Sequence, residues 1–499
     1  MGRFALRSTV FVTLATTVAG LLLAGTAVAA PAPGGQTVGD PYYPTDGNTG
    51  YDVGHYDLRL QYQPSTDQLS GTATILATAT QDLSQFSFDF GLHTDSVLVN
   101  NVPATYSSTG AKLVITPATY LAKGSPITVV VRYDGIPSQV TINGEQDWLR
   151  TPDGAQAVQE PHMAAFWYPA NDHPTDKATY DVSVAVPDGT QVISNGTLVS
   201  SPSRLGQTRW NWRSTKPQAT YLTFIAIGKY EIRRTTGPDG KPVISAYSTA
   251  IGANRDAAIA SVERTPEVLA WESSLFGPFP FEAQGGVVPG VDFGFALETQ
   301  TRPVYTPAFF NGGSDVSVIV HENAHQWFGD AVSVNRWSNI WLNEGFASYA
   351  EWLWSEKEGE GTAQQLFDYY YNLYPASDAR WQILTGDPGA DHQFSGFGVY
   401  TRGALALHAL RTTVGDDNFF AILKAWVASR EYSDGTINQF IGIAEKVSGK
   451  PLHDLFQQWL FTPAKPALAS SFAAHTTSVK PKSAAQIDRT RDLLSSANH

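Results

Sequence analysis

The chain of 499 residues contains no cysteine. It therefore has no disulfide framework, no thiolate metal ligand and no cysteine nucleophile. Charge is also sparse, because only 16% of the residues are Asp, Glu, Lys or Arg, and the formal net charge is −13. A surface that binds nucleic acid or an anionic membrane needs the opposite sign. We therefore expect no nucleic-acid partner.

Long apolar runs are equally scarce, and the longest lies at the N-terminus. Arg3 and Arg7 precede an apolar stretch from about Val10 to Leu23, and the small-x-small sequence Ala27-Val28-Ala29 follows. This order is typical of a secretory signal peptide. No later run is long enough to cross a bilayer. We predict a signal peptide at residues 1–29, a mature chain without a membrane anchor and a secreted location; the oligomeric state stays open.

The remaining composition, 42% hydrophobic and 12% aromatic, is that of a folded protein, and its length favours more than one domain. Residues 30–48 are rich in Gly, Pro, Asp and Thr, which predicts a flexible leader. Residues 49–235 contain short runs of alternating hydrophobicity punctuated by turn residues, which predicts an antiparallel β-sandwich-like domain. Residues 236–465 show mainly helical spacing, and 466–499, without an apolar period, are predicted to be a disordered tail. The predicted fold class is α+β, multidomain.

The sequence His321-Glu322-Asn323-Ala324-His325 follows the pattern HExxH. Two histidines four residues apart on a helix lie on one face, since each residue turns the helix by roughly 100°. Glu344 begins a second predicted helix and supplies a third ligand. Two histidines, one glutamate and an open position are the coordination of a catalytic zinc site. We predict one Zn²⁺ per chain, with Glu322 taking a proton from the zinc-bound water as it attacks a carbonyl.

Around this motif the sequence resembles the gluzincin aminopeptidases of the aminopeptidase N and leukotriene hydrolase type. Their signature is HExxH, eighteen intervening residues and Glu, which His325 and Glu344 reproduce within the block 321–347. Residues 295–299, Phe-Ala-Leu-Glu-Thr, stand where the family has Gly-Ala-Met-Glu-Asn, and residues 399–405 match the segment of its catalytic tyrosine. The resemblance covers roughly residues 50–465. It implies a thermolysin-like catalytic domain.

The resemblance also implies roles for single residues. Glu298 would bind the free α-amino group of a substrate, a role that suits a carboxylate in a dry pocket. Glu160 would be a second amine anchor, with Gln159 as the alternative one residue away. Tyr400 would donate a hydrogen bond to the oxyanion. The implied activity is that of a zinc aminopeptidase that acts on peptides with a free N-terminus.

Two departures from the family pattern bear on specificity. In the exopeptidase motif Phe295 replaces a glycine, Leu297 a methionine and Thr299 an asparagine, so we expect the preference for the first substrate residue to differ. The chain after Glu344 is also too short for the large C-terminal helical domain of many family members, and we expect that domain to be absent. Two alternatives stay open: a zinc endopeptidase, if Glu298 and Glu160 bind no amine, and a non-catalytic binding protein.

Overall fold

The structure, a computed structural model, describes residues 1–2, 30–468 and 479–496. The predicted signal peptide lies outside the described residues, apart from its first two. In the described part of the chain, no helix combines the length and the apolar character that a membrane span requires.

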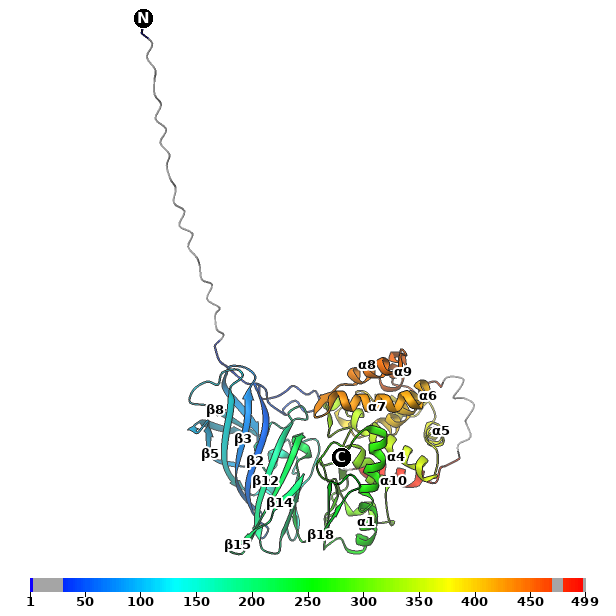
Figure 1. Ribbon diagram of the computed structural model, residues 1–499, viewed down its shortest axis with the longest axis horizontal. Coiled ribbons are helices and arrows are strands. Elements are labelled where there is room, and N and C mark those ends of the chain that lie inside the picture. Colours follow the sequence, from blue (N-terminus) through cyan, green and yellow to red (C-terminus); the bar gives the residue numbers. More distant parts are fainter. Residues whose placement is uncertain (3–29, 469–478, 497–499) are drawn as a thin grey trace. The chain divides into compact units, whose positions relative to one another are not determined.

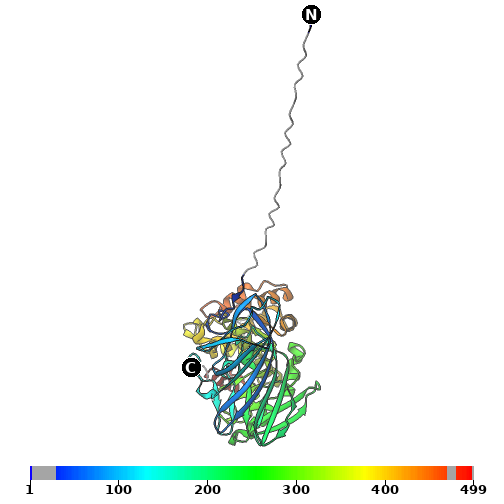
Figure 2. The same ribbon diagram turned by 90° about the vertical axis from the view of Figure 1, so that its left-hand side faces the viewer.

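The N-terminal half is built on a nine-stranded sheet with the order β14-β16-β12-β2-β3-β9-β5-β6, in which β15 also pairs with β16 (Figures 1 and 2). Along β2, buried and exposed side chains alternate over nearly the whole strand, as predicted from the sequence. One neighbouring pair, β2 and β12, runs parallel, so this sheet is not wholly antiparallel. The strands are β2 (Tyr51–Gln63), β3 (Gln68–Ala79), β5 (His93–Val99), β6 (Val102–Pro103), β9 (Pro126–Gly135), β12 (Ala178–Pro187), β14 (Thr197–Ser200), β15 (Ser203–Arg204) and β16 (Gln207–Gln218).

Two four-stranded sheets complete this half. In the first, β1-β4-β8-β7, aromatic side chains pack against the large sheet, where the ring of Tyr51 meets those of Phe86 and Phe88 edge-on. The second has the order β10-β11-β17-β13. The bounds are β1 (Ala32–Pro33), β4 (Leu83–Asp89), β7 (Thr105–Thr109), β8 (Lys112–Thr116), β10 (Trp148–Arg150), β11 (Ala155–Ala157), β13 (Gln191–Ser194) and β17 (Ile225–Gly228).

The second half begins with a five-stranded sheet and continues with helices. The sheet has the order β18-β19-β20-β22-β21, and its first strand crosses the predicted boundary at residue 235 because it pairs with β19. The change of fold therefore falls between β17 and β18. The strands are β18 (Tyr230–Thr236), β19 (Pro242–Ser248), β20 (Val287–Val288), β21 (Ala296–Leu297) and β22 (Val304–Tyr305); β23 (Val332–Val334) pairs with β24 (Ser433–Gly435) among the helices.

Helices α1 to α9 lie within residues 236–465, where the sequence predicts helical spacing. Capping boxes begin α5 and α8, where Thr362 and Thr436 each accept a hydrogen bond from the backbone three residues on. The helices are α1 (Arg255–Val262), α2 (Thr265–Phe276), α3 (Ser317–Ala324), α4 (Trp341–Glu358), α5 (Ala363–Leu373), α6 (Arg402–Val414), α7 (Asp416–Arg430), α8 (Ile437–Ser448), α9 (His453–Leu460) and α10 (Ala484–Ser496). The predicted fold class, a β-rich domain followed by a mainly helical one, is confirmed.

The prediction of a flexible leader at 30–48 is wrong. Strand β1 pairs with β4, and Asp40 is buried, where it accepts a hydrogen bond of 2.9 Å from the backbone N–H of Trp337. The hydroxyl of Tyr42 donates to Asp387 over 2.5 Å. The partners of the leader lie far along the chain, and its composition therefore does not reveal them.

The prediction of a disordered tail at 466–499 is wrong for residues 484–496, which form α10. Ala484, Ile487, Thr490 and Leu494 are buried along one side of this helix. Two of these four side chains are Ala and Thr, so the buried side is too weakly apolar to give a clear helical period in the sequence.

Candidate active site

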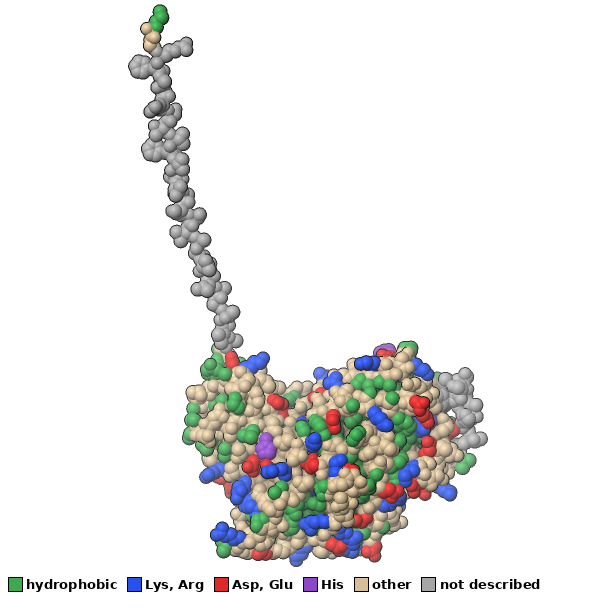
Figure 3. All heavy atoms as spheres, viewed as in Figure 1, with side chains coloured by type: hydrophobic (Ala, Val, Ile, Leu, Met, Phe, Trp, Pro, Cys, Tyr) green, Lys and Arg blue, Asp and Glu red, His purple; other side chains and the backbone are tan. Residues whose placement is uncertain are grey.

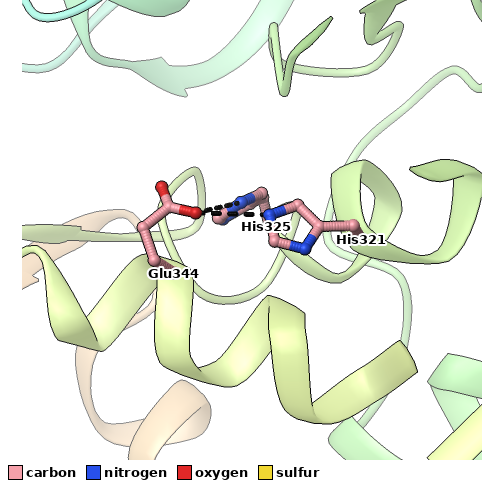
Figure 4. A group of neighbouring side chains, drawn as sticks. All are labelled: His321, His325 and Glu344. Carbon is pink, nitrogen blue, oxygen red and sulfur yellow. Dashed lines mark hydrogen bonds and ion pairs between the residues drawn. The ribbon is translucent and has the colours of Figure 1, made fainter. Parts of the chain in front are cut away.

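Helices α3 and α4 place two histidines and a glutamate against one another. The first turn of α3 buries Val318, Ile319 and Val320, and this fixes the helix in the core. In Figure 4 the carboxylate of Glu344, from α4, points at both imidazole rings. Glu344 Oε2 lies 3.2 Å from His321 Nε2 and 3.5 Å from His325 Nε2.

The outer nitrogens of both rings are also bound. His321 Nδ1 lies 2.9 Å from Oε1 of Glu351, and His325 Nδ1 lies 3.0 Å from the carbonyl oxygen of Phe328. Such partners fix the orientation of a ligand histidine and leave Nε2 free for a metal. Our sequence reasoning missed Glu351. A signal for it existed, because it lies two helical turns after Glu344 and therefore on the same face of the helix.

The histidines and carboxylates of this cluster shift one another's pKa, and their ligand atoms converge on one point. Burial opposes charge on the imidazole, but the hydrogen bonds that it donates to Glu344 and Glu351 outweigh this effect and raise the pKa of His321 to about 9. Burial likewise works against the Glu344 carboxylate, yet His325 and His321 lower its pKa to about 2. The three ligand atoms lie within 4.8 Å of one another. A donor set of two imidazoles and a carboxylate that converges in this way fits one zinc ion.

All the residues that were predicted for the site line a single cavity. These are Glu160, Glu298, His321, Glu322, His325, Glu344 and Tyr400. The cavity is completed by Gln159, Phe295, Ala296, Phe394 and Leu494. Glu322 follows His321 on α3 and is buried, and this burial raises the pKa of its carboxyl well above the ordinary value. Segments from both halves of the chain thus build one site.

Two further carboxylates lie in this cavity. The hydroxyl of Tyr221 donates a hydrogen bond of 3.1 Å to the Glu298 carboxylate. The side-chain amide of Gln326 donates one of 2.8 Å to the Glu298 backbone oxygen. Sequence reasoning also missed Tyr221. Glu160 Oε1 is buried without a hydrogen-bond partner among the described residues. Burial and the nearby Glu298 raise the pKa of Glu160 strongly, so this carboxylate lacks a positive partner.

Gln159, the alternative to Glu160, is engaged elsewhere. Its amide donates to Asp147 over 3.4 Å, and its side-chain oxygen accepts from the backbone N–H of Glu160 over 3.0 Å. The unpartnered oxygen of Glu160 makes it the better candidate for binding an ammonium group.

Tyr400 lies in a single π-helical turn (Gly396–Thr401) that leads into α6. Its ring is stacked on His321, with centroids 5.7 Å apart and planes inclined by 16°. Burial, reinforced by Glu344, raises the pKa of Tyr400 well above its ordinary value. The phenol therefore keeps its proton and is available as a hydrogen-bond donor.

The residues that depart from the family motif differ in their placement. Phe295 lines the cavity, and its ring meets that of Phe293 edge-on at 4.8 Å. Thr299 is buried, and its hydroxyl donates to the backbone oxygen of Arg302 over 2.7 Å. Phe295 is thus the departure that can contact a substrate, whereas Thr299 stabilises the loop that follows β21.

Comparison with known proteins identifies the class to which this site belongs. The family model described as the peptidase family M1 domain matches residues 311–459, and that of the peptidase M1 N-terminal domain matches residues 53–222. The chain therefore belongs to peptidase family M1, as the sequence resemblance implies.

Among curated relatives, aminopeptidase N of Lactococcus lactis is 23% identical over 85% of this chain and 52% of its own length. Glutamyl aminopeptidase of Rattus norvegicus is 24% identical over 85% of this chain and 48% of its own length. The chain thus spans about half the length of these relatives. A mutant of the M1 zinc metallopeptidase from Deinococcus radiodurans has a similar structure, with a TM-score of 0.77 and 28% identity over 87% of this chain and 99% of that one. A second structure of that mutant, with a TM-score of 0.77 and 29% identity over the same shares, holds a Tyr-Ser-Ala substrate.

Proposed function

We propose that this protein is a zinc aminopeptidase that removes single residues from the N-terminus of peptides. The observation that carries the proposal is the position of Glu298 and the unpartnered Glu160 in the same cavity as His321, His325 and Glu344. Two buried carboxylates beside a metal centre provide a place for a free α-ammonium group, which an endopeptidase does not need. The related Deinococcus enzyme, whose structure contains Tyr-Ser-Ala, supports a short peptide as substrate.

His321, His325 and Glu344 would hold the zinc ion. When bound, the ion supplies a Lewis acid that polarises a carbonyl and brings the pKa of a water towards about 7. Glu322 accepts the proton of the attacking water and passes it to the leaving amine. Its position suits this exchange, because Glu322 lines the same cavity as the three metal ligands.

The other residues position the substrate and stabilise charge. Glu298 and Glu160 bind the ammonium group and so place the first peptide carbonyl next to Glu322. Tyr400 donates its hydroxyl proton in a hydrogen bond to the carbonyl oxygen as negative charge develops there. Phe295 contributes an apolar surface beside the first side chain.

Exchange of Glu322 for Gln tests the mechanism. The carboxamide keeps the shape of the side chain but cannot accept the proton, so we expect kcat to fall by about 10²–10⁴-fold while zinc remains bound. Turnover of aminoacyl-arylamides and the zinc content of the same preparation are the measurements. Undiminished turnover in the Glu322→Gln variant would contradict the assigned role.

A second experiment separates the aminopeptidase from the endopeptidase. Peptides with a free N-terminus and the same peptides with an acetylated N-terminus are compared as substrates. Acetylation removes the positive charge that Glu298 and Glu160 bind, and cleavage of the acetylated peptides is therefore expected to be lost. Equal cleavage of both sets would favour an endopeptidase.

We further propose that the protein is secreted. The support is the sequence of residues 1–29 alone, with its basic start, apolar stretch and Ala27-Val28-Ala29. The mixed surface agrees with a soluble mature chain, since acidic and basic side chains are interspersed on the face in Figure 3. N-terminal sequencing of the exported protein should begin at Ala30; an intact residue 1 in that fraction would contradict cleavage.

A further inference from the structure

The C-terminal helix α10 reaches the catalytic cavity although it lies outside the matched family domain, which ends at residue 459. Leu494, near the end of α10, lines the cavity together with Phe394 and Tyr400. Its side chain is 6% exposed. The chemistry proposed above does not use this residue.

The first half of α10 is anchored to the start of α3. Asp315, just before α3, accepts a hydrogen bond of 2.7 Å from Gln486 and one of 3.1 Å from Arg489. The hydroxyls of Ser483 and Ser355 lie 2.7 Å apart. The helix therefore has a defined position relative to α3, which carries both histidine ligands.

The second half of α10 is attached to the turn that carries Tyr400. Arg491 donates a hydrogen bond of 3.3 Å to the hydroxyl of Thr401, which directly follows Tyr400 in the chain. Ser495 lies close to Gly396, at the start of the same turn. Leu494 thus enters the cavity from the side of Tyr400.

The enclosed part of the cavity is small while α10 is in this position. Its volume is about 20 Å³, which is room for about one water molecule. An amino-acid residue of a peptide needs several times this space, so at least one wall must move before a substrate binds. Leu494 is one of these walls, and it belongs to a helix outside the matched family domain.

Resting on the proposed function, we propose that α10 determines which substrates reach the site, with Leu494 as the specificity-determining residue. The ammonium group is bound by Glu298 and Glu160, and Tyr400 meets the carbonyl oxygen. The rest of the peptide must continue past Tyr400, where Leu494 lines the cavity. Peptides are therefore cleaved only when α10 is displaced, and longer peptides depend on this displacement more than small arylamides do.

A truncation of Leu494 tests the role of its side chain. In Leu494→Ala we expect kcat/KM for tetrapeptides to rise about tenfold, the size of effect that a small change in an apolar pocket has on selectivity. The kcat/KM of the same variant for aminoacyl-arylamides should rise by a smaller factor. Ala485→Ser is the matched control, because Ala485 is exposed on the same helix. An unchanged ratio between the two substrate classes in Leu494→Ala would overturn the proposal.

A reversible cross-link tests the displacement of the whole helix. A Cβ atom on Gly396 would lie 3.3 Å from Cβ of Ser495, close to the spacing of about 3.5–4.5 Å in disulfides. The pair Gly396→Cys and Ser495→Cys forms the only disulfide that the chain allows, because the natural sequence has no cysteine. Both changes are made in a Glu322→Ala background, and binding of Tyr-Ser-Ala is measured by calorimetry in the oxidised and reduced states.

The oxidised form should bind the tripeptide at least about tenfold more weakly than the reduced form, in line with the loss of an accessible pocket. Equal affinity in both states, or no binding in either, would overturn the role of α10. Because Glu322→Ala removes turnover, this result does not depend on catalysis. A different combination of results would contradict the proposed aminopeptidase function and not the role of α10. In that case the affinity of the cysteine variant depends on its redox state, but the unchanged protein cleaves no peptide with a free N-terminus.

Discussion

At the scale of single residues, the structure assigns a positioning role to Glu351. Its carboxylate lies 2.9 Å from His321 Nδ1 and also accepts a hydrogen bond from Ser317. In Glu351→Ala the imidazole loses this partner, and we expect the affinity for zinc to fall about 10–100-fold. Competition with a chelator of known affinity measures the change without any need for turnover.

Two further variants separate positioning by Glu351 from a general effect on α4. Glu351→Gln can still accept a hydrogen bond from His321, so it should retain more zinc affinity than Glu351→Ala. Glu358→Ala, at the partly exposed end of the same helix, should bind zinc like the unchanged protein. Equal zinc affinity in all of these proteins would contradict the role of Glu351.

The residues of the site differ in how far the sequence could predict them. His321, His325 and Glu344 follow from ligand types at helical spacing, and Glu298, Glu160 and Tyr400 from the family resemblance. Glu351 shares a helical face with Glu344, but this spacing does not show which side chain it contacts. Tyr221 carries no pattern of this kind, and both contacts depend on how distant elements pack. Their hydrogen bonds span 30 and 77 residues of sequence, respectively. Tertiary structure, rather than local spacing, therefore creates these contacts.

At the scale of elements, helix α2 contains a buried acid that weakens the fold at high pH. Glu272 is fully buried, and neither of its carboxylate oxygens has a hydrogen-bond partner among the described residues. Burial raises its pKa well above the ordinary value, so the folded chain disfavours the charged form of this carboxyl. We expect Glu272→Met, which keeps a similar volume, to raise the thermal midpoint at pH 8.

The number of protons bound by Glu272 in the folded and unfolded states determines how the stability changes with pH. Above the unfolded pKa of about 4.3, the native state binds one more proton at Glu272 than the unfolded state. Glu272 therefore contributes fully to the free energy of unfolding only below that pH. As the pH rises towards the folded pKa, this contribution falls by up to about 1.4 kcal/mol per pH unit. The advantage of Glu272→Met should grow from pH 5 to pH 8. Glu267→Met, on the same helix but half exposed and paired with Arg264, should show no such growth.

The elements themselves were predictable wherever one face is clearly apolar. Strand β2 and helices α5 and α8 follow periods of two and 3.6 residues, since one side of each faces the core. The leader and α10 escaped prediction because polar contacts hold them. Asp40 and Asp315 are buried acids that each bind several partners, and a hydrophobic period does not report such bonds.

At the scale of the whole molecule, the catalytic cavity joins segments from residue 159 to residue 494. A ligand bound there stabilises every element that contributes a wall, because it binds the folded chain and not the unfolded one. The buried carboxylates strengthen this coupling, since Glu298 and Glu322 raise the pKa of Glu160 and a bound cation would offset their repulsion. The fold is therefore expected to depend on zinc more than a protein with a solvated metal site would.

Removal of the metal tests this dependence. Zinc at about 1,000 times its dissociation constant stabilises the folded state by about 4 kcal/mol, so a chelator should lower the thermal midpoint by several degrees. His325→Ala removes a ligand and should abolish the difference between zinc-loaded and chelated samples. Glu322→Gln should keep it, because this side chain binds no metal, and so should His93→Ala, whose side chain is 71% exposed. Equal midpoints with and without zinc in the unchanged protein would contradict a metal held by His321, His325 and Glu344.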